Sequence, residues 1–439
     1  LAIHSTGAIH MSTVPNTGFD DPTATPARSI PPLPLWRNRD YLLLIGGQGV
    51  SAVGSQISLV AFPLLIFALT RSPAQTGLMA SLRTLPYALF TLPAGALVDR
   101  WNRKYLMILC DAGRAIALGS IPVALLLGHL TYLQLYVVSL LEGTLFVFFT
   151  LAESASFPRV VTPEQLPAAT GQNEVLTSMA SLIGPALGPI LYGLGRTVPF
   201  LADAISYAVS MISLLFIKTR FQEERTIDQG KSRRLWSEVK EGIDWLWHHP
   251  VLRFLAILTF GLITPCFGYV LIIIVLAQNM HASNVTLGLI FAGGGIGSVV
   301  GALVASPLYK RLGFAKVLIS SAWLWAVLWL LYAFAPNPLI LGTVNALSFT
   351  VVPIYTVGQY SYRLATIPDQ LQGRVNSVFR FIALSGQPLG IVLTGFLLQT
   401  IGPVPTVLVL FLPQGVLAVA ATFNTRLRKI VRIEQGDQG

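Results

Sequence analysis

The chain has 439 residues, of which 53% are hydrophobic and only 11% are charged. This composition excludes an ordinary soluble protein of the same length and indicates a protein that crosses a membrane several times. The net charge of +10 does not indicate a nucleic-acid partner, because the lysines and arginines lie mainly in short connections between apolar segments.

Residues 1–36 are polar and rich in Ser, Thr and Pro, and we expect them to be disordered. Met11 could be a native start, and no cleavable signal peptide is expected. Six apolar segments then form a predicted N-terminal bundle over 37–218, and a linker follows over 219–249. Six more form a C-terminal bundle over 250–425, before a basic tail over 426–439.

Each of the twelve segments is close to the ~20 residues that a bilayer requires, so the sequence predicts an all-α membrane protein. The spans are 42–69, 75–98, 105–127, 132–157, 172–194, 198–218, 251–278, 285–308, 315–335, 338–361, 377–400 and 404–424. If both termini are cytoplasmic, the loops on the opposite side carry only Arg71 and Arg196 as cations. This asymmetry predicts cytoplasmic N- and C-termini.

A charged turn joins the second and third spans, with Gly95 and Asp99 followed by Arg100, Arg103 and Lys104. Gly95 would let a neighbouring helix pack closely, and Asp99 could favour the positive end of another helix. We expect this turn to latch the two bundles together on the cytoplasmic side; the alternative is an ordinary basic turn. Its expected partners lie in the inner parts of the third and fourth spans: Asp111, Arg114 and Glu153.

Ionisable residues inside membrane spans are costly and therefore indicate function. Arg83 in the second span and Glu142 in the fourth lie at similar depth, so they could pair and couple transport to protons. The alternative is a static ion pair. Asp203 is the rival acid, but we expect it near the outer surface and exposed to water.

Polar residues in the first and tenth spans could line a substrate cavity, although hydrogen bonds between helices would explain each of them equally well. The first span contributes Gln48, Ser51, Ser55 and Gln56, and the tenth contributes Asn345, Tyr355, Gln359 and Tyr360. In the fifth span, Gly184, Pro185 and Gly188 form a predicted kink whose small residues would approach a helix of the other bundle. The alternative is a kink that only serves packing.

The linker contains an amphipathic pattern over 232–249, with Leu235, Val239, Ile243 and Leu246 at helical spacing. We expect a helix that lies on the inner leaflet and ties the two bundles together. The two cysteines, Cys110 and Cys266, lie in apolar spans and predict neither a disulfide nor a metal site.

The turn over 95–104 resembles the G-x-L-a-D-r-x-G-r-k signature of the major facilitator superfamily, with Asn102 in place of the second Gly. The segment 184–189 resembles the antiporter motif G-P-x-x-G-G, with Pro189 in place of the last Gly. The short stretches 163–166 and 368–371 match each other at equivalent places in the two halves, as repeated halves of a transporter would. Within this superfamily, the sequences of 111–115, 242–250 and 371–380 resemble the enterobactin-exporter and macrolide-efflux branch.

This resemblance implies a bacterial inner-membrane transporter that exports drugs, siderophores or similar small molecules in exchange for protons. It implies a proton gradient as energy source, no cofactor or metal, a monomer in the lipid bilayer, and a small-molecule substrate. Two alternatives stay open: an importer or lipid translocator on the same fold, and a membrane enzyme or receptor. The sequence shows no Ser-His-Asp arrangement and no metal-site pattern, which counts against an enzyme.

Overall fold

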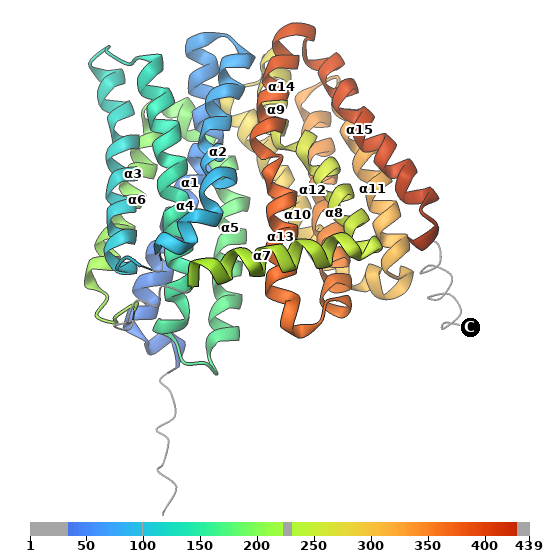
Figure 1. The fold of residues 1–439 in the computed structure, drawn as a ribbon. Coiled ribbons are helices and arrows are strands. Elements are labelled where there is room, and N and C mark those ends of the chain that lie inside the picture. Colours follow the sequence, from blue (N-terminus) through green and yellow to red (C-terminus); the bar gives the residue numbers. More distant parts are fainter. Residues whose placement is uncertain (1–33, 99, 223–230, 428–439) are drawn as a thin grey trace, which may run out of the picture.

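The computed structural model describes residues 34–98, 100–222 and 231–427, and these residues form helices and short connections without any strand. The helices stand side by side in two groups, with α7 running across one face of the molecule (Figure 1).

The N-terminal group comprises η1 (Leu35–Arg37), α1 (Arg39–Thr70), α2 (Pro73–Val98), α3 (Arg103–Leu126), α4 (Tyr132–Val160), α5 (Leu166–Leu194) and α6 (Val198–Phe216). The linker forms α7 (Lys231–His248). The C-terminal group comprises α8 (Pro250–Ile263), η2 (Thr264–Gly268), α9 (Tyr269–Asn279), α10 (Asn284–Leu312), α11 (Phe314–Leu331), η3 (Tyr332–Phe334), α12 (Pro338–Thr366), η4 (Asp369–Leu371), α13 (Gln372–Ser385), α14 (Gln387–Ile401) and α15 (Pro403–Phe423).

Eleven helical runs among the described residues are long and apolar enough to cross a membrane. The remaining predicted span, 75–98, is also helical and forms α2, which packs against α4 and α14. It is less apolar than the others because it carries Arg83 and several small polar residues. The prediction of an all-α membrane protein built from two six-span groups is confirmed, whereas residues 35 and 36 belong to η1 although we expected disorder there.

Two predicted spans are broken, and both breaks lie in the C-terminal group. The seventh divides at η2, which contains Pro265, and the eleventh divides at Gly386, which is followed by Pro388. A proline lacks the backbone N–H that a continuous helix needs. The two breaks pack directly on each other. Gly386 has no side chain, and this permits the close contact, since a Cβ at that position would lie only 2.0 Å from Oγ1 of Thr264.

The two groups contact each other through α2 with α14 and α5 with α10. At one end of these helices, Ser72 donates a hydrogen bond to Gln399 at 2.9 Å, and Gly77 and Gly395 pack backbone against backbone. In Figure 1 this end is at the top, whereas α7 crosses the front of the molecule nearer the other end. The groups are therefore joined at the end away from α7.

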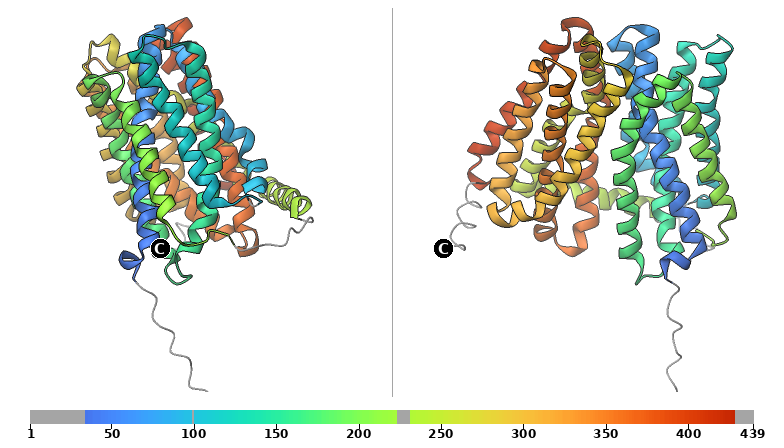
Figure 2. Two further views of the ribbon diagram at one scale, coloured as in Figure 1. Left: turned by 90° about the vertical axis from the view of Figure 1, so that its left-hand side faces the viewer. Right: turned by 180° about the vertical axis from the view of Figure 1, so that it is seen from behind.

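The predicted amphipathic helix is present as α7, which lies outside the packed helices in the side view of Figure 2. It packs against α13, where Glu241 accepts a bond from Arg374 at 2.6 Å. The absence of a side chain on Gly242 brings the two helices together, since a Cβ there would lie 3.0 Å from the Arg374 carbonyl. Thus α7 connects the N-terminal group to a broken span of the C-terminal group; its place on the inner leaflet stays a prediction.

Candidate functional site

A buried cluster of charges lies inside the N-terminal group, centred on Glu142 of α4, which is 3% exposed. Arg83 of α2 donates to both carboxylate oxygens, from Nε at 2.5 Å and from Nη2 at 3.1 Å. Arg114 of α3 donates from Nη2 to Oε1 at 3.2 Å. The pairing of Arg83 with Glu142 is therefore confirmed. The sequence did not predict the second arginine, because we expected Arg114 to belong to the charged turn.

Tyr207 of α6 completes the cluster. Its hydroxyl donates to Oε1 of Glu142 at 3.2 Å and accepts a bond from Arg114, whose guanidinium also lies 3.9 Å from the centre of the tyrosine ring. Ser55 of α1 lies 2.8 Å from the same hydroxyl. Three helices thus supply hydrogen-bond partners to the carboxylate on α4, and α1 contacts the cluster through Ser55. The signal for Tyr207 was its position four residues after Asp203, which places both on one face of α6.

Close packing of α2 on α4 brings Arg83 and Glu142 together. Gly143 makes this packing possible, because a Cβ at that position would lie 2.0 Å from the Arg83 carbonyl oxygen. Two guanidinium groups, one carboxylate and one hydroxyl thus form one hydrogen-bonded network, in which Nε of Arg114 has no partner among the described residues. Removing one partner would lower the stability of the fold, because the remaining buried charge has lost its hydration and has no compensating interaction.

Two further acids lie near the cluster. Asp111 is fully buried, with Oδ1 3.9 Å from Arg114. Asp203 is also fully buried, and its Oδ1 accepts a bond from Ser206 at 3.2 Å. The prediction that Asp203 is exposed to water is wrong, because α1 packs closely over it at Gly54.

A polar cavity of about 220 Å³ adjoins the cluster on one side. The polar face of α1 lines it, as the sequence suggested, together with residues of α3, α4 and α5. Arg114 and Ser55 belong both to the cluster and to the cavity wall. The lining includes these predicted polar residues: Gln48, Ser51, Ser55, Gln56, Arg114 and Glu153.

A second cavity, of about 120 Å³, lies between the two groups and is lined by Arg83. Its wall is mostly apolar and includes residues from both breaks of the C-terminal group, Phe267 of η2 and Gln387 of α14. The side chain of Arg83 is 17% exposed, compared with 4% for Glu142. The cluster therefore separates a polar cavity, reached by Arg114, from an apolar cavity, reached by Arg83.

The predicted residues of the tenth span, now α12, do not share one site. Asn345 lines a third cavity of about 280 Å³ between α5 and α10, where it bonds to Tyr332 and to the Ile290 carbonyl. Tyr355 lies in the hydrophobic core, with its hydroxyl 2.7 Å from that of Thr259. Gln359 is buried at 6% exposure and Tyr360 is 48% exposed.

The charged turn is described in part. Asp99 lies outside the described residues. Arg100 is exposed, whereas Arg103 donates to the carbonyl of Ala155 at 2.7 Å and Lys104 to that of Ile217 at 2.6 Å. These carbonyls lie near the ends of α4 and α6, where cations offset the negative end of a helix.

Two predictions for this region need correction. Among the described residues, no atom of a neighbouring element lies within 4 Å of a Cβ built on Gly95, so close packing at this glycine is not seen in the present conformation, in which the groups meet at the other end. Arg114 belongs to the Glu142 cluster because its position on α3, well inside the membrane-spanning run, places it beside α4 and α6 rather than at the turn.

The antiporter-like segment also packs differently from the prediction. A Cβ on Gly184 would lie 2.3 Å from the Gln56 Cβ, and one on Gly188 would lie 2.8 Å from the Ile57 carbonyl oxygen. Both glycines thus face α1 of the same group, while Pro185 lines the third cavity. The contact of α5 with the other group depends instead on glycines of α10, where a Cβ on Gly288 would lie 2.6 Å from the Ala186 carbonyl oxygen.

Two groups of membrane-spanning helices, cavities between and within them, and a buried ionisable cluster define a membrane transporter rather than an enzyme. The chain belongs to the Major Facilitator Superfamily, whose family model matches residues 44–274 and 253–437.

The sequence relatives include efflux proteins. The chain is 28% identical over 403 residues to the "Multidrug efflux pump Tap" of Mycolicibacterium fortuitum, covering 89% of this chain and 96% of that protein. It is 26% identical over 209 residues to the "Macrolide efflux protein A" of Streptococcus pyogenes, covering 47% of this chain and 51% of that protein.

Solved structures with the same fold are more distant in sequence. The nucleoside transporter NupG has a TM-score of 0.68 at 14% identity, covering 88% of this chain and 98% of that one. A bacterial homologue of the iron transporter ferroportin in an inward-facing state has a TM-score of 0.69 at 17% identity, covering 89% and 99%. These likenesses establish the fold.

Proposed function

We propose that this transporter exports small organic molecules from the bacterial cytoplasm in exchange for protons, and that Glu142 carries the proton. The observation that supports the proposal is the position of Glu142 between two cavities, bonded to Arg83, Arg114 and Tyr207. The efflux function of the sequence relatives supports the direction of transport and a drug-like substrate.

The cluster is suited to a change in the protonation state of Glu142. Two arginines favour the carboxylate form of Glu142, while burial favours the neutral acid. If a helix movement or a substrate draws one arginine away, the balance moves toward the acid, and Glu142 takes up a proton. Arg83 is the arginine that can be drawn away, because it lines the cavity between the two groups, and this cavity changes shape when they move.

The proposed orientation places both termini and α7 in the cytoplasm, as the distribution of cations favours. The contacts of α2 with α14 and of α5 with α10 then close the outer side, so the conformation corresponds to an inward-facing state. Release to the outside requires these contacts to open while the cytoplasmic side closes, which is alternating access between the two groups.

Transport into inside-out membrane vesicles tests the proposal, with a macrolide and a fluorescent cationic dye as probes. Glu142→Gln mimics the protonated acid, so it should bind the probe but lose accumulation driven by an imposed pH gradient. Asp203→Asn is the matched control, since it removes a buried acid of the same group and should keep gradient-driven uptake. Full gradient-driven uptake by folded Glu142→Gln would remove Glu142 from the mechanism. Uptake in the opposite direction would favour the importer alternative.

A further inference from the structure

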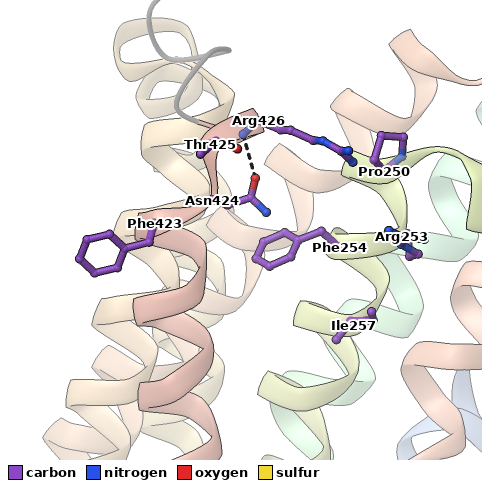
Figure 3. A pocket seen from close by; sticks show the side chains of 8 residues that line it. All are labelled: Pro250, Arg253, Phe254, Ile257, Phe423, Asn424, Thr425 and Arg426. Atoms are coloured by element: carbon purple, nitrogen blue, oxygen red, sulfur yellow. Dashed lines mark hydrogen bonds between the residues drawn. The ribbon is translucent and has the colours of Figure 1, made fainter.

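A pocket of about 530 Å³ lies apart from the charge cluster, between the first turns of α8 and the end of α15. It is on the face of the molecule that α7 crosses. Eight residues line it: Pro250, Arg253, Phe254, Ile257, Phe423, Asn424, Thr425 and Arg426 (Figure 3). The proposed transport function uses none of them.

The pocket combines a basic end with an apolar wall. Arg253 is in the first turn of α8, and Ile257 is four residues later, so both lie on one face of the helix about 6 Å apart along its axis. Figure 3 shows Arg426 extending from the end of α15 toward Pro250, while Phe254 points from α8 toward α15. Arg426 therefore lies at one end of the pocket, Arg253 and Phe254 lie beside each other on α8, and Ile257 follows one turn further along the helix.

The charge of the pocket is uncompensated within its own wall. Two of the eight lining residues are arginines and none is acidic. Arg253 donates from Nη1 to the Trp247 carbonyl at 3.4 Å, which orients the guanidinium, and its other N–H groups have no hydrogen-bond partner among the described residues. The charge of Arg426 reaches the start of α8, because it adds to the effect of burial in lowering the pKa of His249.

The pocket lies at headgroup depth if the spans cross the membrane as their length and composition indicate. The run Pro250–Asn279 begins at the pocket, and the run Pro403–Phe423 ends there. Ile257 is 46% exposed and Phe423 is 66% exposed on the outside of the protein, where lipid chains would cover them. A ligand for this pocket needs an anionic head and an apolar chain, and the surrounding bilayer supplies such molecules.

We propose that this pocket binds one anionic phospholipid of the leaflet on the α7 side. The phosphate contacts Arg253 and Arg426, and an acyl chain lies along Phe254 and Ile257 and past Phe423. Arginine suits the phosphate because its planar guanidinium can donate two parallel hydrogen bonds. The bound lipid would fix the end of α15 against the start of α8, where the broken seventh span begins.

Native mass spectrometry of the full-length protein in neutral detergent tests this proposal, with dioleoylphosphatidylglycerol as probe and dioleoylphosphatidylcholine as neutral reference. Wild-type protein should retain the anionic lipid preferentially. Each arginine replaced by alanine should weaken its binding about fivefold, and the Arg253→Ala/Arg426→Ala double variant about 25-fold. The neutral lipid should be unaffected.

The matched control is Lys310→Ala/Arg311→Ala, which removes two cations from the last turn of α10 on the same face of the C-terminal group. It should retain the lipid; an equal loss would mean diffuse charge attraction and overturn the site. Phe254→Ser/Ile257→Ser keeps both arginines and should also weaken lipid binding. If glycerol 3-phosphate competes as well as the lipid does, the occupant is a soluble phosphate and the proposal is wrong.

Discussion

Tyr207 shows how one hydroxyl can hold a buried charge cluster together. It donates to Glu142 and accepts from Arg114, so its loss would remove one hydrogen bond from each of two buried charged groups. The sequence predicted Arg83 and Glu142 from their equal depth alone. It could not predict Arg114 or Tyr207, because depth does not say toward which neighbour a side chain points, and that direction depends on how each helix is rotated.

We predict that Tyr207→Phe lowers the free energy of unfolding by about 1–3 kcal/mol, the usual cost of leaving buried polar groups unsatisfied. Transport driven by a pH gradient should persist, since Glu142 keeps both arginines. Denaturant unfolding in micelles measures the first effect and vesicle transport the second. Tyr192→Phe is the control, because the buried hydroxyl of Tyr192 has no hydrogen-bond partner among the described residues. Equal costs for the two variants would contradict the assigned role of Tyr207.

His249 predicts a pH dependence of stability at the start of α8. Its ring accepts a hydrogen bond from the backbone N–H of Leu252 at 3.4 Å, which caps the helix, and burial together with Arg426 lowers its pKa below 6.5. The unfolded chain therefore binds a proton more readily than the folded protein does. Stability from this residue is complete above pH 6.5 and is lost as the pH falls through the lower pKa of the folded state.

Thermal unfolding in micelles at pH 8 and pH 5 should reveal this loss in the wild type. His249→Asn keeps an N-capping side chain without a titrating group, so its melting temperature should fall less between the two pH values. His248→Asn is the neighbouring control and should leave the pH response unchanged. If both variants respond to pH as the wild type does, His249 does not contribute.

At the scale of elements, α10 carries two kinds of helix contact. Gly288 faces α5 of the other group, where a Cβ would lie 2.6 Å from the Ala186 carbonyl oxygen. Gly297 faces α12 of its own group, where a Cβ would lie 1.9 Å from the Ala346 carbonyl oxygen. One glycine therefore supports a contact that must open during transport, and the other supports a contact that persists.

We expect Gly288→Ala to shift the population away from the present conformation, because only the separation of α5 from α10 relieves the clash. Gly297→Ala should instead cost about 1–3 kcal/mol of stability by overpacking, without changing the conformational ratio. Spin-label distances between the outer ends of α5 and α10 measure the ratio, and denaturant unfolding measures the cost. Unchanged distances in Gly288→Ala would show that this contact does not control the outer side.

Helix boundaries were largely predictable, whereas helix breaks were not. The stretch 251–278 stays largely apolar through its break, because a break between two apolar segments changes the backbone and not the hydropathy. The stretch 377–400 carries a short polar interruption at 385–387, which by itself does not distinguish a helix break from a polar turn of a continuous helix. Pro265 and Pro388 were visible in the sequence, but other prolines such as Pro63 and Pro122 lie inside continuous helices. Neighbouring helices decide which proline ends a helix, and the chain does not show those neighbours.

For the whole molecule, the sequence predicted two groups of six spans and their orientation relative to the bilayer. The fold could be predicted because hydropathy and cation counts act independently of tertiary packing. The faces along which α5 and α10 meet could not, because side-chain volumes of two distant segments determine them together. The orientation itself stays a prediction.

Reporter fusions test that orientation. Green fluorescent protein fused after Gly439 should fluoresce, and alkaline phosphatase at the same place should be inactive, because the first folds only in the cytoplasm and the second only outside it. The control is phosphatase inserted at His129, in the connection between α3 and α4, which should be active. The reverse pattern would show that the protein has the opposite orientation in the membrane, and the proposed export would then be import.

The buried charge cluster around Glu142 and the broken helices lie in different halves of the molecule. Arg83, Arg114 and Glu142 belong to continuous spans of the first half, whereas both breaks belong to the second, and the cavity lined by Arg83 lies between them. If Glu142 carries the proton, protonation takes place in the first half, whereas the helix breaks, at which a span can bend, lie in the second half.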